Sequence, residues 1–466
     1  VAVRGTEPGG LQLPLDLLLA DGLGVVLAGK ARDQAIAAYR YFKKLTTVPG
    51  QPVVYSSQEK LMLAGLYTGI FNPLTTAAGY VAISALVAGD DGLGSGAVPL
   101  IPSGAKINFT GHSLGGHVAT LLAQLVAANG SAGMIGDIVT YNAPGQGSIA
   151  ANLAQWLGIP LADQTIANQI TNIIGEGGMN ATAWIGNRPG TIQNLFIEEE
   201  TNPINNHSIV KLSDSLAVYE LFNKINANFS LDDIKAILKA SSTTSLSSLE
   251  NSTLALYKLF KGTATDIAAG DRTTFYDKVA ELRTAIAASA NSQSLNIISL
   301  AAAAADTLKT AAQNPSSLAV RYALKELNPF AVFGVDYSAF NTAGQLDLYD
   351  PATNAGEMTK EYLADRAAFL TWKNKLATED FDGTTGAYSK APDAYFKDLG
   401  SNLLINLGSG GSLTDKPRDI FGADQASGAT ENLAGGSKAD RLYGGGGMDV
   451  LNGDAGDDYL EGNSGD

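Results

Sequence analysis

The chain has 466 residues, of which 45% are hydrophobic, and it carries a formal net charge of −15 with no cysteine. The length allows a large core and two or three domains. The acidity argues against nucleic acid as a partner, and the lack of cysteine excludes disulfides and thiolate chemistry. The apolar runs are too short to cross a bilayer, which indicates a soluble globular protein. The chain begins VAVRGTEPGG, without methionine, and ends NSGD inside a repeat, so we expect a fragment shortened at both ends.

The first 222 residues alternate short apolar runs with longer helical patterns, as α/β domains do. Two stretches rich in apolar and aromatic residues, 61–74 and 77–89, read either as a lid or lipid-facing surface or, at least equally, as core helices. Buried strands are expected at 1–3, 106–109, 137–141 and 170–174, and helices at 31–45 and 117–128.

The motif GHSLG, residues 111–115, is the only G-x-S-x-G of the sequence. It follows the apolar KINFT and precedes the helical pattern GHVATLLAQLVAA. This strand–turn–helix context is typical of a nucleophile elbow, in which glycines relieve crowding around a strained serine. We therefore predict that Ser113 is a nucleophile, and that the backbone N–H of Leu114, at a helix start, contributes to an oxyanion hole.

Three histidines are available as the base for this serine. His112 adjoins the serine, and in a tight turn its side chain points away from the hydroxyl. His117 lies about one helical turn further on, so a packing or supporting role is expected for both. His207 lies in the polar loop TNPINNHSIVKL, after the serine, which fits the order serine, acid, histidine of α/β hydrolases. We predict that His207 is the base.

The acid of such a site is expected between the serine and His207, just after a strand. Glu176 follows the apolar ITNIIG directly, at the carboxyl end of a predicted strand, where an acid can orient the imidazole. Asp163, in a loop after a helix, is the next candidate. Asp137 opens a strand and so belongs at the wrong end of the sheet, and the run 198–200 (EEE) reads as a solvated face.

The segments VAVRGT, GHSLGG, YNAPGQG (141–147) and ITNIIGE (170–176) together resemble the class 3 (fungal-type) lipase family of α/β hydrolases. The resemblance implies that Thr6, at the end of the first strand, supplies the second oxyanion-hole donor. It also puts Glu176 in the place of the triad acid, where the family usually has aspartate. The family's opening strands are absent, and the long spacing from Thr6 to Ser113 predicts an insertion between them.

The middle of the chain is not covered by this resemblance. Residues 223–325 read as almost purely helical, which fits an inserted cap, a spacer or an interaction module. Residues 326–418 read as a mixed α/β connecting region with a helix at 359–377. The expected domains are therefore a catalytic domain (1–222), a helical insertion or cap (223–325), a connecting region (326–418) and a repeat domain (419–466).

Residues 419–466 carry 10 acidic and 2 basic residues, a net −8. From Gly435 they read in nines as GGSKADRLY, GGGGMDVLN and GDAGDDYLE, with aspartate sixth and leucine eighth. This is the G-G-x-G-x-D-x-U-x pattern of a parallel β-roll, in which glycine turns and aspartates bind Ca²⁺. A flexible linker would not repeat both places three times. The expected ligands are Gly435, Gly436, Asp440, Gly444, Asp449, Gly453 and Asp458.

These repeats resemble the RTX family, with a degenerate turn at 426–434 before them. The resemblance implies structural Ca²⁺, export in an unfolded state by a type I secretion system, and folding in extracellular calcium. A hydrolase joined to such a tail resembles secreted bacterial RTX lipases and phospholipases.

The expected function is that of a secreted serine hydrolase of carboxylic esters, either a triacylglycerol lipase or a phospholipase A, that meets lipid at an interface. The alternative is an RTX surface or adhesion protein with an inactive hydrolase-like domain. The intact serine, the late histidine and the RGT strand end argue against that alternative. A metalloenzyme has little support, because there are three histidines and no H-E-x-x-H.

Overall fold

The chain forms two compact units, Val1–Ser213 and Asp214–Asp466. The division between them falls inside helix α9 (Ile209–Ile225), which also contains residue 222, and the three segments expected after residue 222 lie in one unit. No helix within the described ranges is long and apolar enough to span a membrane. The computed structural model describes residues 2–3, 31–68, 73–90, 93, 101–102, 104–145, 164–177, 188–242, 247–263, 265–290, 294–381, 391–408, 416–424 and 430–463.

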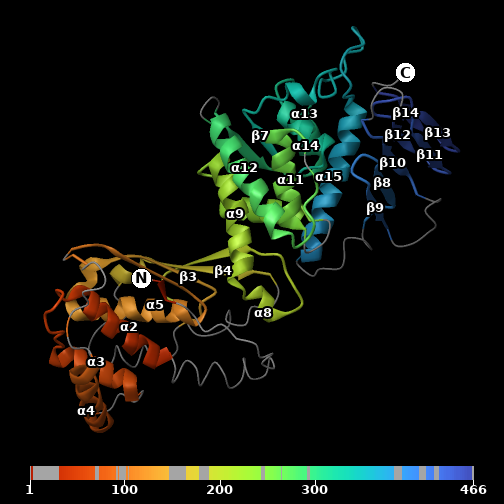
Figure 1. Ribbon diagram of the computed structural model, residues 1–466. Helices are drawn as coiled ribbons and strands as arrows, with labels where there is room; N and C mark the ends of the chain where they lie inside the picture. Colours follow the sequence, from red (N-terminus) through yellow and green to blue (C-terminus); the bar gives the residue numbers. More distant parts are fainter. Residues whose placement is uncertain are drawn as a thin grey trace. The chain divides into compact units, whose positions relative to one another are not determined.

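A parallel sheet of five strands, in the order β1-β2-β3-β4-β5, forms the centre of the first unit (Figure 1). The apolar stretches predicted as strands pair in register, with Thr110 opposite Val139, and alternate residues of β2 are buried. Strand β5 was not predicted. Its sequence TIQNLF is half polar, because its first residues are exposed at the edge of the sheet. The strands are β1 (Ala2–Val3), β2 (Ile107–His112), β3 (Ile135–Tyr141), β4 (Ile170–Glu176) and β5 (Thr191–Phe196).

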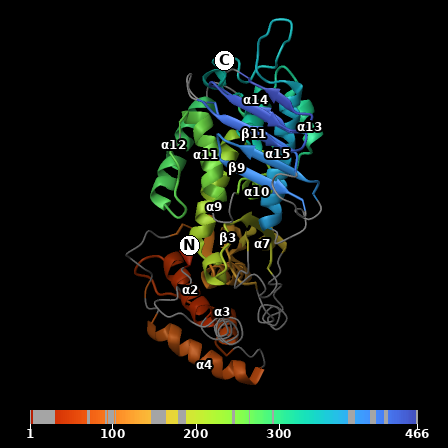
Figure 2. The ribbon, with the colours of Figure 1, turned by 90° about the vertical axis from the view of Figure 1, so that its right-hand side faces the viewer.

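Helix α5 (Leu114–Val126) packs on β2 and β3, and α2 (Ala31–Thr46) packs on α5. The predicted insertion forms two helices in contact, and Figure 2 shows α4 at the margin of this unit. Leu63 and Ile83 are fully buried while Val81 is 69% exposed, so these helices extend the core and also present an apolar side. They are α3 (Ser57–Thr68) and α4 (Pro73–Asp90), and the shorter helices of the unit are η3 (Ala127–Ser131), η4 (Ala132–Met134), α7 (Gln164–Ala167) and α8 (Pro203–Asn206).

From Asp214 to Lys325 the second unit is mostly helical, as expected for residues 223–325, with one exception. Strand β6 (Asn296–Ser299) pairs antiparallel with β7 (Phe330–Phe333), so the stretch expected to continue as helix is extended there. Its paired isoleucines favour a strand, and the alanine-rich stretch becomes helical only from Ala305. The helices are α10 (Leu231–Ala240), α11 (Ser248–Lys261), α12 (Arg272–Ala290), α13 (Ala305–Ala312), α14 (Leu318–Lys325), η5 (Ser338–Phe340) and α15 (Lys360–Phe381).

Helix α15 lies against a second sheet, whose order is β14-β12-β10-β8-β9 (Figure 2). Aromatic rings join the two: Phe369 of the helix stacks on Phe396 at 5.2 Å and on Phe421 at 5.9 Å. The strands are β8 (Ala394–Asp398), β9 (Leu403–Leu407), β10 (Arg418–Phe421), β12 (Arg441–Tyr443) and β14 (Tyr459–Glu461), and β11 (Asn432–Gly436) pairs with β13 (Val450–Asp454) in a separate sheet.

The repeat strands alternate between these two sheets along the chain. All their pairings are parallel, with Leu433 opposite Leu451 in one sheet and Leu442 opposite Leu460 in the other. The eighth-place leucines therefore stack on one another, and Leu433 and Leu442 are buried. This agrees with the inward packing that the nonapeptide pattern predicts for that place.

Candidate active site and calcium-binding repeat

Ser113 lies in the turn between β2 and α5, where the motif predicts it. Its backbone has φ 56° and ψ −133°, a conformation that residues other than glycine rarely adopt. The Ser113 N–H donates to the carbonyl of Tyr141 on β3 (2.9 Å), and the Gly116 N–H donates to the Ser113 carbonyl (3.0 Å). The strained serine is therefore held between the sheet and the first turn of the helix.

Two glycines beside the serine have no room for a side chain. A Cβ at Gly116 would stand 2.7 Å from the Cβ of Ala143 and 2.7 Å from the carbonyl oxygen of Gly111. A Cβ at Gly111 would overlap the backbone of Gly115 and Gly116. Strand and helix therefore approach backbone to backbone, and this contact defines the turn that the serine occupies.

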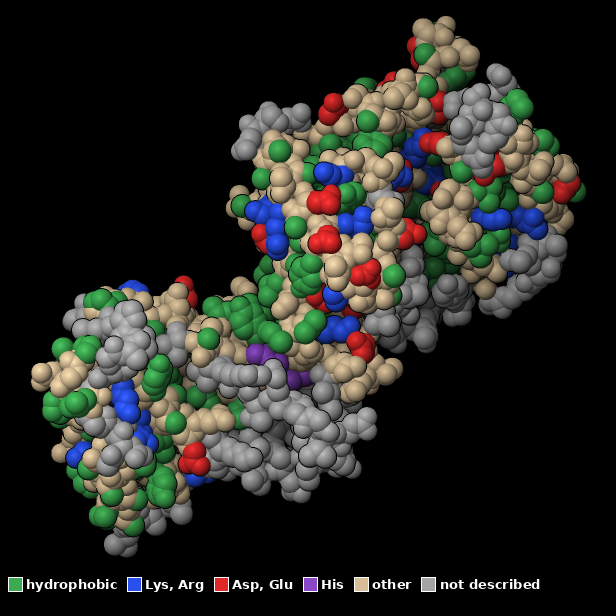
Figure 3. Space-filling view, viewed as in Figure 1, with side chains coloured by type: hydrophobic (Ala, Val, Ile, Leu, Met, Phe, Trp, Pro, Cys, Tyr) green, Lys and Arg blue, Asp and Glu red, His purple; other side chains and the backbone are tan. Residues whose placement is uncertain are grey.

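His207 lies beside the serine although 94 residues separate them in the sequence. Its Nε2 is 2.8 Å from Ser113 Oγ, within the reach of proton transfer. The histidine lies between α8 and α9, in the loop predicted to carry the base. Figure 3 shows histidine side chains gathered on one face of the surface, and both partners of this bond are only partly buried.

Glu200 holds the loop that carries His207 in place through hydrogen bonds and an ion pair. The Glu200 N–H donates to Asn206 Oδ1 (2.8 Å), and Asn206 Nδ2 donates back to the Glu200 carbonyl (2.7 Å). Lys211 pairs with the Glu200 carboxylate at 2.7 Å, which lowers the pKa of that carboxyl. Glu198 is only 4% exposed. The expectation of a solvated face for 198–200 is therefore wrong, because this run joins β5 to the loop of the base.

Two side chains donate to the backbone carbonyl of His207. His112 Nε2 is 2.8 Å and Asn142 Nδ2 is 3.1 Å from that oxygen. Because a carbonyl only accepts, the His112 Nε2 carries a proton. Asn142, buried and with φ 44°, also accepts from the Gly175 N–H at 2.9 Å and so joins β3, β4 and the loop. Asn142 was not predicted from the sequence, although a polar residue directly after a buried strand is the signal for such a residue.

The site keeps the imidazole of His207 neutral. Burial first, and then the imidazole of His112, whose ring centre is 4.9 Å away, lower the pKa of His207 to about 4. At neutral pH the ring nitrogen facing Ser113 can therefore accept a proton. His117 lies in the first turn of α5, where burial lowers its pKa, in keeping with the packing role expected of it.

The structure leaves the acid as a prediction. Glu176 is the last residue of β4, at the carboxyl edge of the sheet where Ser113 follows β2, and its side chain is exposed. Asp163 lies outside the described residues. Asp137 lies near the start of β3, as expected, and so at the end of the strand away from the carboxyl edge where Ser113 lies.

Of the two predicted oxyanion donors, one is within the described residues. Leu114 is the first residue of α5, and the first amides of a helix have no acceptor within it. Thr6 lies outside the described residues. The strand before it, β1, runs parallel to β2 with Val3 opposite Gly111.

In the repeats, the sixth-place aspartates bond to the backbone one turn earlier. Asp458 Oδ1 accepts from the Asp440 N–H (2.9 Å), and Asp449 Oδ1 accepts from the Glu431 N–H (3.1 Å). The other carboxylate oxygen faces the glycines of the same repeat. A Cβ at Gly444 would stand 3.1 Å from Asp449 Oδ2. The predicted ligands Gly435, Gly436 and Asp440, like Gly453 and Asp458, belong to equivalent turns.

These turns suit a hard cation. Asp449 Oδ2 is buried without a hydrogen-bond partner, which is costly unless a cation compensates it. Within the described ranges, no three His, Cys, Asp or Glu side chains gather as a metal site, so further ligands would have to be backbone carbonyls. An all-oxygen set of this kind fits Ca²⁺.

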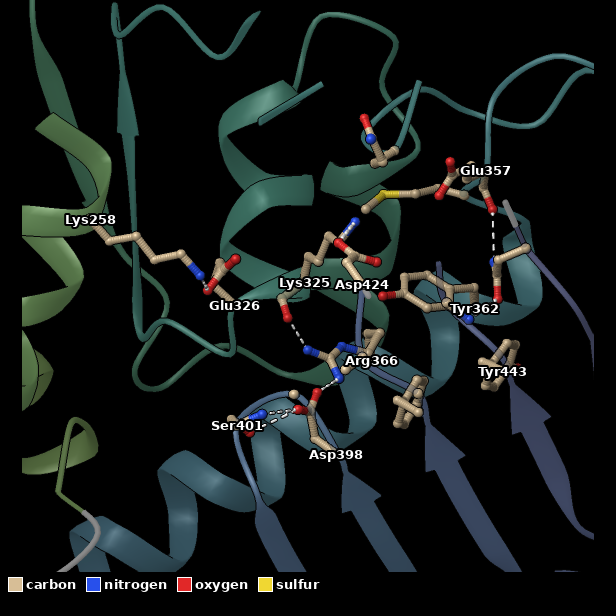
Figure 4. Close-up of a pocket in the computed structure, with 18 residues that line it drawn as sticks. Lys258, Lys325, Glu326, Glu357, Tyr362, Arg366, Asp398, Ser401, Asp424 and Tyr443 are labelled. Atoms are coloured by element: carbon tan, nitrogen blue, oxygen red, sulfur yellow. Dashed lines mark hydrogen bonds and ion pairs between the residues drawn. The ribbon is translucent and has the colours of Figure 1, made fainter. Parts of the chain in front are cut away.

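The second unit also contains a pocket of about 420 Å³ that the sequence did not predict (Figure 4). It lies where β8, β10 and β12 end beside α14 and α15, and six of its seven charged side chains form three ion pairs. Such internal compensation favours a structural junction over a site for a charged ligand. The pairs drawn in Figure 4 are Lys258 with Glu326 (2.6 Å), Lys325 with Asp424 (2.5 Å) and Arg366 with Asp398.

Comparison with known proteins matches the two ends of the molecule separately. Residues 97–172, which include the elbow and Asn142, match the family model for class 3 lipases. Residues 427–466 match the model for the RTX calcium-binding nonapeptide repeat. No curated protein and no solved structure matches the chain. The chain thus combines a segment that is similar to class 3 lipases, a family with the α/β-hydrolase fold, with C-terminal repeats that match the RTX calcium-binding nonapeptide.

Proposed function

We propose that this protein is a serine hydrolase of carboxylic esters that acts on lipids. The observation that carries the proposal is the 2.8 Å contact between Ser113 Oγ and His207 Nε2 at a strained strand–helix turn. A neutral imidazole at this distance takes the serine proton as the oxygen attacks the acyl carbonyl, and then returns it to the leaving alcohol. The class 3 lipase match supports lipid esters, triacylglycerol or phospholipid, as the substrates.

The negative charge that develops on the acyl oxygen is stabilised by backbone N–H groups of Leu114 and Thr6. The position of Leu114 at the start of α5, and the pairing of β1 with β2, support this pair. Glu176 orients His207 through the ring nitrogen that does not face the serine.

The acid is tested with a matched pair of carboxylates. Glu176→Gln should lower kcat by roughly 10²- to 10⁴-fold with little change in stability, because the imidazole loses its orienting partner. Glu198→Gln serves as the control, since Glu198 lies two residues after the end of the neighbouring strand β5 and is buried. A loss confined to Glu198→Gln would move the role to Glu198.

The repeats bind Ca²⁺ in a parallel β-roll, and this calcium is structural. The sixth-place aspartates and the acidity of residues 419–466 support a tail that stays unfolded until calcium is present. The protein is therefore exported unfolded by a type I secretion system and folds outside the cell. RTX repeats are typical of proteins that are secreted in this way.

The reaction is tested on the calcium-loaded full chain with a fluorophosphonate probe, which labels activated serines, and with triacylglycerol and phospholipid esters of different chain lengths. Ser113→Ala should abolish labelling and lower ester hydrolysis by at least about 10⁴-fold. Ser131→Ala, beyond the far end of α5, should keep both. A folded wild-type chain that neither labels nor hydrolyses would favour the alternative, an RTX surface or adhesion protein with an inactive hydrolase-like domain.

A further inference from the structure

His207 is held through its backbone as well as through its ring. Its carbonyl accepts from His112 Nε2 at 2.8 Å and from Asn142 Nδ2 at 3.1 Å. The first donor ends β2 and the second follows β3, whereas His207 enters from the loop after β5. The base, which comes from a loop, is therefore tied by two bonds to the rigid edge of the sheet.

We propose that His112 and Asn142 are positioning residues for the base, an inference that rests on the function proposed above. A loop histidine joined only to the serine can shift along that bond, and a shift of about 1 Å can cost on the order of 10² in rate. Two donors on one carbonyl fix the backbone of His207, and the ring of His112 packs 4.9 Å from the ring of the base. Each donor acts through His207 rather than on the substrate.

The test compares two substitutions of one donor. His112→Leu removes the N–H, while His112→Gln keeps an amide donor close to the place of Nε2. We expect His112→Leu to lower kcat by about 10- to 100-fold with KM nearly unchanged, and His112→Gln to recover most of the loss. Asn142→Gly tolerates φ 44° but deletes the second donor. The double variant should lose less than the product of the single losses, because both donors share one acceptor.

The outcomes separate this inference from the proposed function. If the wild type does not label or turn over, the function fails. If the wild type is active and His112→Leu keeps its kcat, or His112→Gln is as impaired as His112→Leu, positioning by this bond is overturned. Where His112→Leu does not fold, His112→Gln and Asn142→Gly still decide the question.

A second inference concerns the repeats and depends on different contacts. Sixth-place residues form a column in which Asp458 accepts from the N–H of Asp440, and Asp440 Oδ1 accepts from the N–H of Arg418 at 2.8 Å. Strands β10 and β12 pair in the register that continues this column. Arg418 therefore stands to Asp440 as Asp440 stands to Asp458. It occupies a position in the column where an aspartate would continue the pattern.

The guanidinium of Arg418 reaches into the glycine turn above it. Its Nη1 donates to the carbonyl of Gly435 at 2.6 Å and to that of Ala434 at 3.3 Å. A Cβ at Gly436 would stand 3.2 Å from the guanidinium carbon, so a glycine there permits the approach. Turn carbonyls are the groups that the nonapeptide pattern offers to Ca²⁺.

We infer that the guanidinium of Arg418 takes the place of a calcium ion at the N-terminal end of the stacked repeats. Its positive charge lies on the turn carbonyls, beside the glycine that Asp440 Oδ2 faces, before any calcium binds. The column beside the other sheet, in which Asp449 accepts from Glu431, has acid on both levels and a buried carboxylate oxygen without a partner. Calcium-dependent folding therefore starts from a first turn that is already neutralised.

The test measures calcium-induced folding of the full chain by circular dichroism, and bound calcium by equilibrium dialysis. Arg418→Met should raise the calcium midpoint by about tenfold, because charge-assisted bonds to two carbonyls are lost. Lys438→Met is the matched control, since it removes the same charge from an exposed side chain of the adjoining turn, and it should shift the midpoint little. Arg418→Asp, which completes the acidic column, should bind one further Ca²⁺ per chain.

Three results would overturn the inference. The first is an unchanged midpoint in Arg418→Met, and the second is an equal shift in Lys438→Met, which would reduce the effect to net charge. An unchanged calcium count in Arg418→Asp would show that no cation position lies at this level. All variants are compared at saturating calcium as well, where an equal circular dichroism spectrum shows that each still folds.

Discussion

The two sites of this molecule are built in opposite ways. The Ser113 site joins residues 94 positions apart through the edge of a buried sheet, and side chains such as Asn142 satisfy the polar groups around it. In the repeats, bonds join residues 18 positions apart, and acidic oxygens such as Asp449 Oδ2 stay buried without a partner. The Ser113–His207 pair is held by hydrogen bonds of the protein itself, whereas the buried carboxylate oxygen of the repeats calls for a cation. The two should therefore respond differently to the same perturbation.

Removing calcium should show the difference between the two sites most clearly. Chelation with EGTA should abolish the order of residues 430–463, because the stacked carboxylates then repel one another without compensation. Ser113 should still react with the fluorophosphonate probe, since its contacts lie within the first unit. Hydrogen exchange of tail peptides and probe labelling, read in the same sample, check this. Loss of both at one calcium concentration would break the comparison.

Within the loaded repeats, the eighth-place leucines should differ among themselves. Leu442→Ala should lower the free energy of unfolding by about 2–4 kcal/mol, because this leucine is fully buried between its neighbours. Leu460→Ala, at the equivalent place one turn later, should cost less than about 1 kcal/mol, because Leu460 is 48% exposed. Urea unfolding in saturating calcium measures both. Equal losses would mean that the outer turn is buried as deeply as the inner one.

The elbow should be intolerant of a single added methyl group. Gly116→Ala should destabilise the first unit by about 1–3 kcal/mol and reduce probe labelling, because the new Cβ meets Ala143 and the Gly111 carbonyl. Gly133→Ala is the control, since that glycine has open space around it and no positive φ. Thermal unfolding and labelling rates distinguish the two. A neutral Gly116→Ala would mean that strand and helix can separate without cost.

The sequence predicted those parts of both sites that depend on neighbouring residues. The elbow is read from five residues with a strand before and a helix after, and the repeat from nine residues and their period. Strands β2, β3 and β4 follow from apolar runs because they are buried in a parallel sheet. The order serine, acid, histidine along the chain also lets His207 be chosen among three histidines before its contact with the serine is seen.

What the sequence did not predict depends on distant partners. β6 is a strand because β7, more than 30 residues later, pairs with it. Glu200 has a structural role through Asn206 and Lys211, which a run of three glutamates does not indicate. Arg418 falls outside the nonapeptide pattern, and its place in the column appears only when the turns are stacked. Asn142 is likewise explained only by the carbonyl of His207.

The smallest effect expected is the pH dependence of the first unit. The pKa of His207 is about 4, whereas an imidazole in the unfolded chain titrates near 6.5. As pH falls below about 6.5, the unfolded chain takes up a proton that folded His207 does not. The free energy of unfolding therefore falls between those two values, by about 1 kcal/mol at one unit below the unfolded pKa, and is unaffected above them.

The same protonation removes the base, so kcat/KM should fall in acid with a midpoint near pH 4. Urea unfolding at several pH values and a pH–rate profile on a short-chain ester measure the two effects. His207→Gln should remove its part of the stability slope and leave the part due to His117, whose pKa burial also lowers. A kinetic midpoint at or above 6.5 would instead mean that the carboxylate proposed for the other ring nitrogen, Glu176, raises the pKa of His207 by more than burial lowers it. The Ser113 site would then resemble the repeats, in which a buried charge needs a partner of opposite sign.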